Sequence, residues 1–225
     1  MPAAAAIARY LEGLREPEDE ALRAARARAE EADLAPMGPE VGAALRWFAR
    51  LIGARQMVEV GSGGGASGLW LLGGADPRAT LTSIEPDPEV RQLALRAYAD
   101  AGVADRVRSI EGTAPTVLPR LADGGYDLIL LDADPAEYPD LREHVVRMLR
   151  PGGLLLVDDP LAGGRVADEA SEDPAVLGLR RFHAELAEEP SLRPHVAPGS
   201  TALLAAVREP GRASEHPTAR ASGAR

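Results

Sequence analysis

Between residues 56 and 157, short apolar runs alternate with segments of helical character, and this alternation constrains the fold more than any other feature of the chain. The runs are Gln56–Val60, Leu81–Ile84, Val107–Ile110, Tyr126–Leu131 and Leu154–Val157. Each run is long enough for a buried strand, and each interval has room for a helix. Strands joined by helices form a parallel sheet with both faces covered, so the pattern predicts an α/β fold.

The intervening segments predict helices at Ser67–Leu72, Pro88–Ala101, Pro115–Leu121 and Glu137–Leu149, each beginning at or just after a residue suited to a helix start. Further helices are predicted over 7–14, 21–32, 41–52 and 176–186, and a last strand over 202–207. The chain has 225 residues, so we predict a single domain over residues 1–208. Residues 209–225 contain no large apolar side chain and predict a disordered C-terminal tail.

The amino-acid composition excludes several classes of function. The chain has no cysteine, and all 25 of its basic residues are arginine, which excludes thiolate nucleophiles and lysine Schiff bases. The net charge of −10 argues against a nucleic-acid partner, because such binding neutralises phosphates with basic side chains. No apolar run is long enough to span a membrane, and the N-terminus lacks the charge order of a secretory signal. We therefore expect a cytoplasmic protein without a membrane or nucleic-acid partner.

A glycine-rich turn follows the first predicted strand. Gly61-Ser62-Gly63-Gly64-Gly65 leads into Ala66-Ser67-Gly68, which opens a helix. Glycines let a ligand approach the backbone, and the helix start offers free N–H groups. Read from Gly61, the turn also satisfies the dinucleotide pattern G-x-G-x-x-A, so a nicotinamide or flavin enzyme stays open.

Acidic residues stand at the ends of the predicted strands: Glu59, Glu85, Asp132, Asp158 and Asp159. In an open parallel sheet the carboxyl ends of the strands form one crevice, where ligands bind. Glu85 is suited to accept hydrogen bonds from the hydroxyls of a ribose. Several acids around one crevice suit a cationic ligand or a metal ion better than a pyrophosphate, and S-adenosylmethionine, with its sulfonium and amino groups, fits that charge.

Five segments together carry a resemblance to a known family: VEVGSGGGASGLWLL, SIEPDPE, YDLILLDADPAEYPD, LRPGGLLLVDD and PLAGGRVAD, in this order. Over roughly residues 5–208 the chain resembles the class I, S-adenosylmethionine-dependent O-methyltransferases of the catechol and caffeoyl-CoA type, O-methyltransferase family 3, particularly bacterial members. The resemblance implies a Rossmann-like class I methyltransferase fold: a mainly parallel seven-stranded sheet with helices on both faces and extra N-terminal helices. It also implies methylation of a hydroxyl of a small molecule.

The resemblance assigns roles to individual residues. The implied cofactor-binding residues are Met37, Glu59, Gly61, Ser62, Gly63, Ser67, Glu85, Ala114 and Asp132. Of these, Glu59 and the glycines would hold the amino-acid part of S-adenosylmethionine, and Glu85 its ribose. The implied Mg²⁺ ligands are Asp132, Asp158 and Asp159, and the candidate catalytic residues are Asp132 and Asp134.

Three positions depart from the family pattern. Pro135 stands where the family commonly has a lysine that helps deprotonate the acceptor, which leaves Asp134, Tyr138 and solvent as proton acceptors. Asp159 replaces the usual asparagine; it still offers an oxygen to Mg²⁺, although three carboxylates without a metal repel one another. Ala162 stands where relatives often have tryptophan, which puts a catechol substrate in doubt.

Two alternatives to an active methyltransferase stay open. One is an NAD(P)-dependent oxidoreductase, supported by the glycine pattern and Glu85. The other is a catalytically inactive homologue that binds the cofactor, motivated by Pro135 and Ala162. Relatives are often homodimers, so the resemblance also allows a homodimer.

The remaining conspicuous side chains have less specific interpretations. We predict that Trp47 and Trp70 lie in the core, and that His195 lies in a proline-bounded loop without metal-ligand spacing. Loops over 159–174 and 194–201 are expected to shape the acceptor pocket. Arg165 in the first of these loops is suited to attract an anionic acceptor, or is a plain surface arginine.

Overall fold

The computed structural model describes residues 12–197 and 203–210, together with residues 6 and 10. Residues 7–9 and 11 of the helix predicted over 7–14 therefore lie outside the described residues. The predicted disordered tail lies outside them beyond Pro210.

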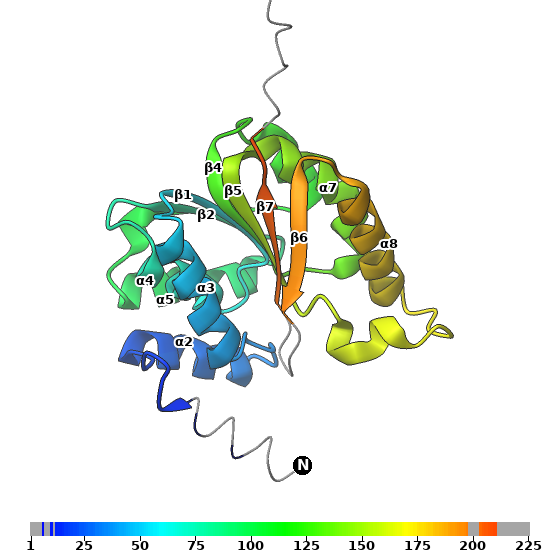
Figure 1. Cartoon of the computed structure of the whole chain (residues 1–225). Coiled ribbons are helices and arrows are strands. Elements are labelled where there is room, and N and C mark those ends of the chain that lie inside the picture. Colours follow the sequence, from blue (N-terminus) through cyan, green and yellow to red (C-terminus); the bar gives the residue numbers. More distant parts are fainter. Residues whose placement is uncertain (1–5, 7–9, 11, 198–202, 211–225) are drawn as a thin grey trace, which may run out of the picture.

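Strands and helices alternate along most of the chain, as the sequence predicts (Figure 1). The strands are β1 (Gln56–Val60), β2 (Thr80–Glu85), β3 (Val107–Glu111), β4 (Tyr126–Leu131), β5 (Leu149–Asp158), β6 (Leu192–Ala197) and β7 (Leu203–Arg208). The α-helices are α2 (Glu20–Glu31), α3 (Pro39–Leu51), α4 (Ala66–Gly74), α5 (Pro88–Asp100), α6 (Ala114–Val117), α7 (Tyr138–Met148) and α8 (Pro174–Glu188). Short 3-10 helices are η1 (Ala104–Arg106), η2 (Leu118–Arg120), η3 (Pro135–Glu137) and η4 (Ala162–Ala167).

The strands form one seven-stranded sheet in the order β3-β2-β1-β4-β5-β7-β6. Strands β1 to β5 pair in parallel, whereas β7 is antiparallel to both of its neighbours. The chain builds outward from β1 to β3 and then returns to β4, so the order reverses between β1 and β4. Ligands bind at such a switch point, beyond the carboxyl ends of the strands. The arrowhead of β6 marks this edge at the lower end of the sheet in Figure 1.

Alternate residues of each strand feed two apolar cores, one on each face of the sheet. In β4, Ile129 and Leu131 belong to the core covered by α6, α7 and α8. Leu128 and Leu130 belong to the other core, covered by α2, α3, α4 and α5. This period-two division explains why the strands read as continuous apolar runs: both faces are buried.

Two expectations from the sequence are wrong. The sequence predicts a loop over 194–201, yet Pro194 and His195 lie within β6, where His195 pairs with Ala205 of β7, and residues 198–201 lie outside the described residues. β6 is an edge strand, and an edge strand tolerates a proline because one side of its backbone needs no partner. The sequence also predicts Trp47 in the core, but Trp47 is 56% exposed on α3, whereas Trp70 is fully buried as predicted.

Candidate active site

The glycine-rich turn joins β1 to α4 at the switch point. Gly61 has φ +89°, and a Cβ at this position would lie 1.9 Å from the backbone oxygen of Asp132. The backbone N–H of Gly61 donates to Ile84 O at 3.0 Å, and the N–H of Asp132 donates to Val60 O at 2.9 Å. The sequence therefore needs glycine here because β2 and the end of β4 both close on the turn.

Glu85 ends β2 and receives hydrogen bonds from the glycine-rich turn. Its Oε2 accepts from the N–H groups of Ser62, at 3.1 Å, and Gly63, at 3.2 Å. Its Oε1 accepts from the N–H of Asp87 at 3.2 Å. Glu85 is 8% exposed, so its carboxylate is buried at the end of β2 rather than in bulk solvent. Two predicted cofactor-binding residues, Ser62 and Gly63, thus donate backbone hydrogen bonds to a third, Glu85.

Glu59 lies one residue before the end of β1 and is 0% exposed. Ser67 Oγ donates to Glu59 Oε2 at 2.9 Å, and the Tyr98 hydroxyl donates to Glu59 Oε1 at 2.6 Å. Burial raises the pKa of Glu59 to about 7, even though the hydrogen bonds from Tyr98, Ser83 and Ser67 favour its charged form. The buried carboxyl therefore stores a proton in mildly acidic solution.

Asp132 and Asp158 extend this acidic set across β4 and β5. Burial, followed by repulsion from Asp158, Glu59 and Glu85, raises the pKa of Asp132 to about 8. Burial also raises the pKa of Asp158, and the charge of Asp159 acts in the same direction. The carboxyls at these strand ends, which are far apart in sequence, thus form one electrostatically coupled group. A cationic ligand would stabilise the charged form of these carboxyls.

The three predicted Mg²⁺ ligands do not gather into a metal centre. Asp159 is exposed, has a left-handed backbone with φ +37°, and accepts a hydrogen bond from Gly163 N at 2.9 Å. In the part of the chain that the structure describes, no group of three acidic or histidine side chains is arranged to hold a metal ion. The carboxylates have the right chemistry for Mg²⁺, but their arrangement does not fit a complete ligand set.

The candidate proton acceptors differ in their surroundings. Asp134 is exposed, and its Oδ1 accepts from Ala136 N at 3.0 Å at the start of η3. The Tyr138 hydroxyl is buried and exchanges hydrogen bonds with the backbone of Ala133, at 3.0 and 3.1 Å. Burial raises the pKa of Tyr138, so its phenol keeps its proton. Asp134 is therefore better placed than Tyr138 to accept a proton from a ligand.

The other predicted residues lie around the same end of the sheet or beside it. Met37 is buried between α2 and α3 and belongs to the core on that face. Ala114 is the buried first residue of α6, shortly after β3. Arg165 pairs with Asp173 and donates from Nε to Ala162 O at 3.1 Å, so its charge holds the loop after β5 together.

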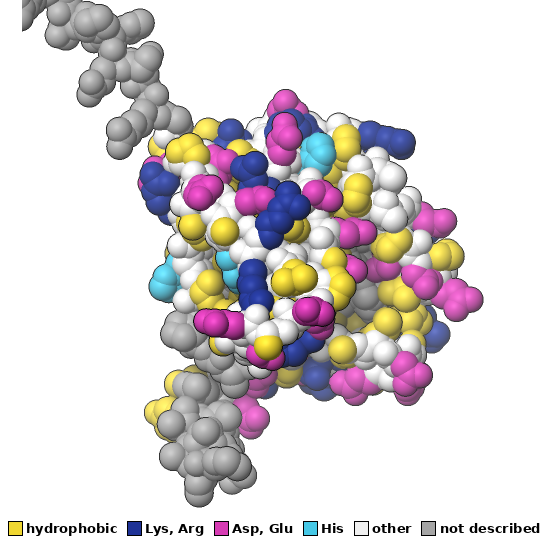
Figure 2. Space-filling model, turned by 90° about the vertical axis from the view of Figure 1, so that its right-hand side faces the viewer, with side chains coloured by type: hydrophobic (Ala, Val, Ile, Leu, Met, Phe, Trp, Pro, Cys, Tyr) yellow, Lys and Arg dark blue, Asp and Glu magenta, His cyan; other side chains and the backbone are white. Residues whose placement is uncertain are grey.

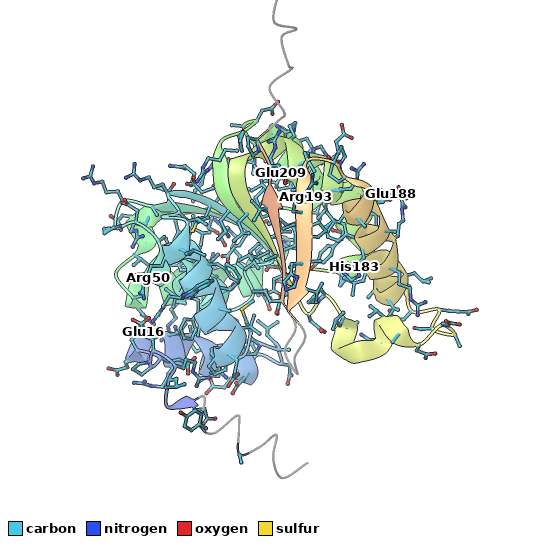
Figure 3. The ribbon with its side chains drawn as sticks, in the orientation of Figure 1. Glu16, Arg50, His183, Glu188, Arg193 and Glu209 are labelled. Atoms are coloured by element: carbon cyan, nitrogen blue, oxygen red, sulfur yellow. The ribbon has the colours of Figure 1, made fainter. Side chains whose placement is uncertain are left out.

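A pocket of about 450 Å³ lies away from this site, at the opposite end of the sheet. Figure 3 shows two of its lining residues, Arg193 and Glu209, at the upper ends of β6 and β7. Arg193 pairs with Glu209 at 2.8 Å, and Arg208 donates to Leu149 O. Arg193 and Arg208 thus already have partners within the protein, so this pocket adds nothing to the chemistry of the strand ends.

A family model described as O-methyltransferase matches residues 15–204. The chain belongs to the O-methyltransferase family. This confirms the resemblance found in the sequence, the methyltransferase fold and the expectation of an enzyme, and it favours methyl transfer over nicotinamide chemistry.

Relatives of this O-methyltransferase include a protein of Mycobacteroides abscessus that is provisionally assigned as an O-methyltransferase. It is 44% identical over 193 residues, which are 85% of this chain and 90% of the relative. The O-methyltransferase TomG of Streptomyces achromogenes, involved in tomaymycin synthesis and solved with S-adenosylmethionine, has a TM-score of 0.83 at 30% identity and covers 91% of this chain and 96% of its own. A Bacillus cereus O-methyltransferase solved with S-adenosylhomocysteine has a TM-score of 0.83 at 28% identity, covering 91% and 97%.

Sequence reasoning missed Tyr98 and Ser83, which complete the surroundings of Glu59. Tyr98 lies on α5, 39 residues after Glu59, outside every motif. The only local signal is an aromatic residue on the buried side of an amphipathic helix, which ordinarily indicates nothing more than core packing. The contact depends on the packing of α5 against α4 and β2, which no local sequence pattern specifies.

Proposed function

We propose that this protein is an S-adenosylmethionine-dependent O-methyltransferase that methylates a hydroxyl of a small molecule. The observation that carries the proposal is the convergence of Glu59, Glu85, Asp132 and Asp158 beside the glycine-rich turn, in a member of the O-methyltransferase family. A coupled group of buried and half-buried acids favours a ligand with positive charge, and S-adenosylmethionine carries a sulfonium and an ammonium group.

The residues of the turn fit this cofactor. Gly63 has no other atom within 4 Å of where a Cβ would lie, so a ligand has room against its backbone. Glu85 would accept hydrogen bonds from the ribose hydroxyls, and Ser67 and Glu59 would lie at the amino-acid end. Met37, Gly61, Ser62, Ala114 and Asp132 complete the proposed cofactor-binding set.

S-adenosylmethionine supplies an electrophilic methyl group when it is bound. The protein's contribution is to align the acceptor oxygen with that methyl, and alignment by itself is worth about 7 to 11 kcal/mol of a barrier. We assign Asp132 and Asp134, which follow β4, to the acceptor side of the site, and the exposed Asp134 carboxylate is our candidate to take the hydroxyl proton directly or through water.

Calorimetric titration of S-adenosylhomocysteine tests the cofactor assignment. The wild-type protein should bind it. Glu85→Ala should weaken binding by about tenfold or more, because a charged hydrogen-bond acceptor is lost. Glu89→Ala is the matched control: it removes the same charge from an exposed position four residues away and should leave affinity unchanged. Absence of binding to the wild-type protein would refute the proposal, and NADH titration would then test the oxidoreductase alternative.

The catalytically inactive alternative is tested separately. It predicts S-adenosylhomocysteine binding without methyl transfer to any member of a panel of phenols and hydroxylated metabolites. Turnover of one acceptor removes it.

Mg²⁺ assistance remains a prediction. Asp132, Asp158 and Asp159 supply oxygen ligands, but Asp159 would have to turn from Gly163 to complete the set. Titration with Mg²⁺ alone should give a signal that Asp158→Ala abolishes, and a wild-type protein that gives no signal would exclude the assignment.

The proposed partner is a small molecule. Figure 2 shows arginine side chains interspersed with acidic ones on the face that carries α8, rather than the continuous basic surface that a phosphate backbone requires. None of the helices in the described residues is long and apolar enough to cross a membrane. A cytoplasmic location stays a prediction.

A homodimer is also kept as a prediction. Trp47 and Leu51 of α3 are more than half exposed, which gives this helix apolar surface that a second copy could cover. Light scattering coupled to size exclusion measures the assembly directly, and a monomeric mass at micromolar concentration would contradict it.

A further inference from the structure

The hydroxyl of Tyr98 reaches from α5 to the carboxylate of Glu59 on β1. The O–H donates to Glu59 Oε1 at 2.6 Å, and Ser83 Oγ on β2 lies 3.5 Å from the same hydroxyl. Tyr98 and Glu59 are both fully buried. A hydrogen bond to a carboxylate is shorter and stronger than one between neutral groups. This contact therefore fixes Glu59 more firmly than packing alone would.

Helix α4 leaves room for the contact at Gly68. A Cβ at this position would lie 2.5 Å from the Tyr98 hydroxyl oxygen and 2.9 Å from Glu59 Oε1. Glycine inside a helix is destabilising relative to alanine, so its place in α4 needs a reason. The close approach of Tyr98 to Glu59 supplies that reason.

The second carboxylate oxygen of Glu59 is held from α4. Ser67 Oγ donates to Oε2 at 2.9 Å, so donors from two different helices fix the two oxygens. Ser67 is the second residue of α4, where the helix presents N–H groups that have no partner within the helix. Tyr98 thus orients, through Glu59, a serine in the first turn of α4.

Resting on the proposed function, we infer that Tyr98 is a positioning residue for the cofactor. From α5 it holds the Glu59 carboxylate, and through it Ser67, in the orientation that receives the amino-acid end of S-adenosylmethionine. Tyr98 is buried behind Glu59 and acts through that carboxylate.

The charges around Glu59 provide a readout specific to this role. Glu85 on β2 repels Glu59, and Glu59 in turn adds to the repulsion at Asp132 after β4. The phenol hydrogen bond acts in the opposite sense and lowers the pKa of Glu59. Removal of the hydroxyl should therefore shift the ionisation of Glu59 to higher pH. Loss of core packing alone would produce no such shift.

The test is calorimetric titration of S-adenosylhomocysteine into the full chain over a range of pH, with Tyr98→Phe and a matched control. Tyr126→Phe is the control, because Tyr126 is also buried but begins β4 at the far end of the sheet. Tyr98→Phe should weaken binding at neutral pH by about tenfold and move the midpoint of its pH dependence upward. Tyr126→Phe should change neither.

Wild-type affinity and an unshifted pH profile in Tyr98→Phe would overturn the inference while leaving the proposed function intact. No binding to the wild-type protein would instead count against the proposed function.

A second comparison covers the case in which Tyr98→Phe does not fold. Glu59→Gln removes the buried charge, so the double variant Glu59→Gln/Tyr98→Phe avoids an unpaired carboxylate and should fold. If the hydroxyl serves to hold the charged Glu59, the double variant should bind S-adenosylhomocysteine within about twofold of Glu59→Gln alone. A further tenfold loss would show that Tyr98 acts independently of Glu59 and would refute its positioning role.

Discussion

Replacement of Gly61 by alanine should destabilise the protein more than the same replacement two residues later. At Gly61, the new Cβ would lie 1.9 Å from the backbone oxygen of Asp132, and φ is +89°. At Gly63, φ is +45° and no atom lies within 4 Å of the Cβ position. Both variants incur left-handed strain of about 1–2 kcal/mol. Gly61→Ala adds an overpacking cost of about 1–3 kcal/mol, because the obstructing atom is backbone held by a strand ladder.

The expected loss in the free energy of unfolding is thus about 2–5 kcal/mol for Gly61→Ala and about 1–2 kcal/mol for Gly63→Ala. For a domain of this size, each kcal/mol lowers Tm by about 2–4 °C. Differential scanning calorimetry on both variants measures the difference, and the reduced entropy of the unfolded chain cancels because both changes are Gly→Ala. Equal Tm values for the two variants would refute the reasoning that the approach of Asp132 dictates glycine at position 61.

Three further outcomes are expected. Burial raises the pKa of Glu59 from 4.5 to about 7, so between these pH values the folded protein holds a proton that the unfolded chain releases. The free energy of unfolding should therefore fall by on the order of 3 kcal/mol as the pH rises from 4.5 to about 7. Urea titrations measure this fall, which should be shallower in Glu59→Gln. Asp159→Asn should stabilise by up to about 0.5 kcal/mol, since asparagine suits φ +37° and one charge beside Asp158 is removed; a lower urea midpoint would contradict this. Tyr138→Phe should cost about 1–3 kcal/mol through the lost contacts with Ala133, and an unchanged Tm would show that these contacts contribute nothing.

Much of the fold could be predicted because its signals are local. The predicted strands at 56–60 and 126–131 match β1 and β4 residue for residue, since apolar runs of that length between helices have few other solutions. β6 escaped prediction because its sequence, LRPHVA, has one polar face and a proline. Only its place at the edge of the sheet makes that composition acceptable.

The candidate site likewise has features that the sequence predicts and features that depend on the folded structure. Its acids could be located from the sequence, because parallel strands must end at one edge and Glu59, Glu85, Asp132 and Asp158 stand at those ends. The ionisation of these acids could not be predicted from the sequence, since the pKa of Asp132 depends on burial and on charges from three other strands. The pairing of Asp159 with Gly163 depended likewise on a loop backbone that the composition does not specify.

The alternation of apolar runs and helices was enough to predict a doubly covered, mainly parallel sheet, because each run and each helix is specified by a few neighbouring residues. The five motifs in their order carried the resemblance to O-methyltransferases, which the family model confirms. The tertiary structure decided which side chains meet across the core. Tyr98 and Glu59 are 39 residues apart and share no motif, and their 2.6 Å contact exists because α5 packs against α4 and β2, where Gly68 of α4 leaves space. Burial, repulsion and such contacts depend on distances that the chain acquires only on folding.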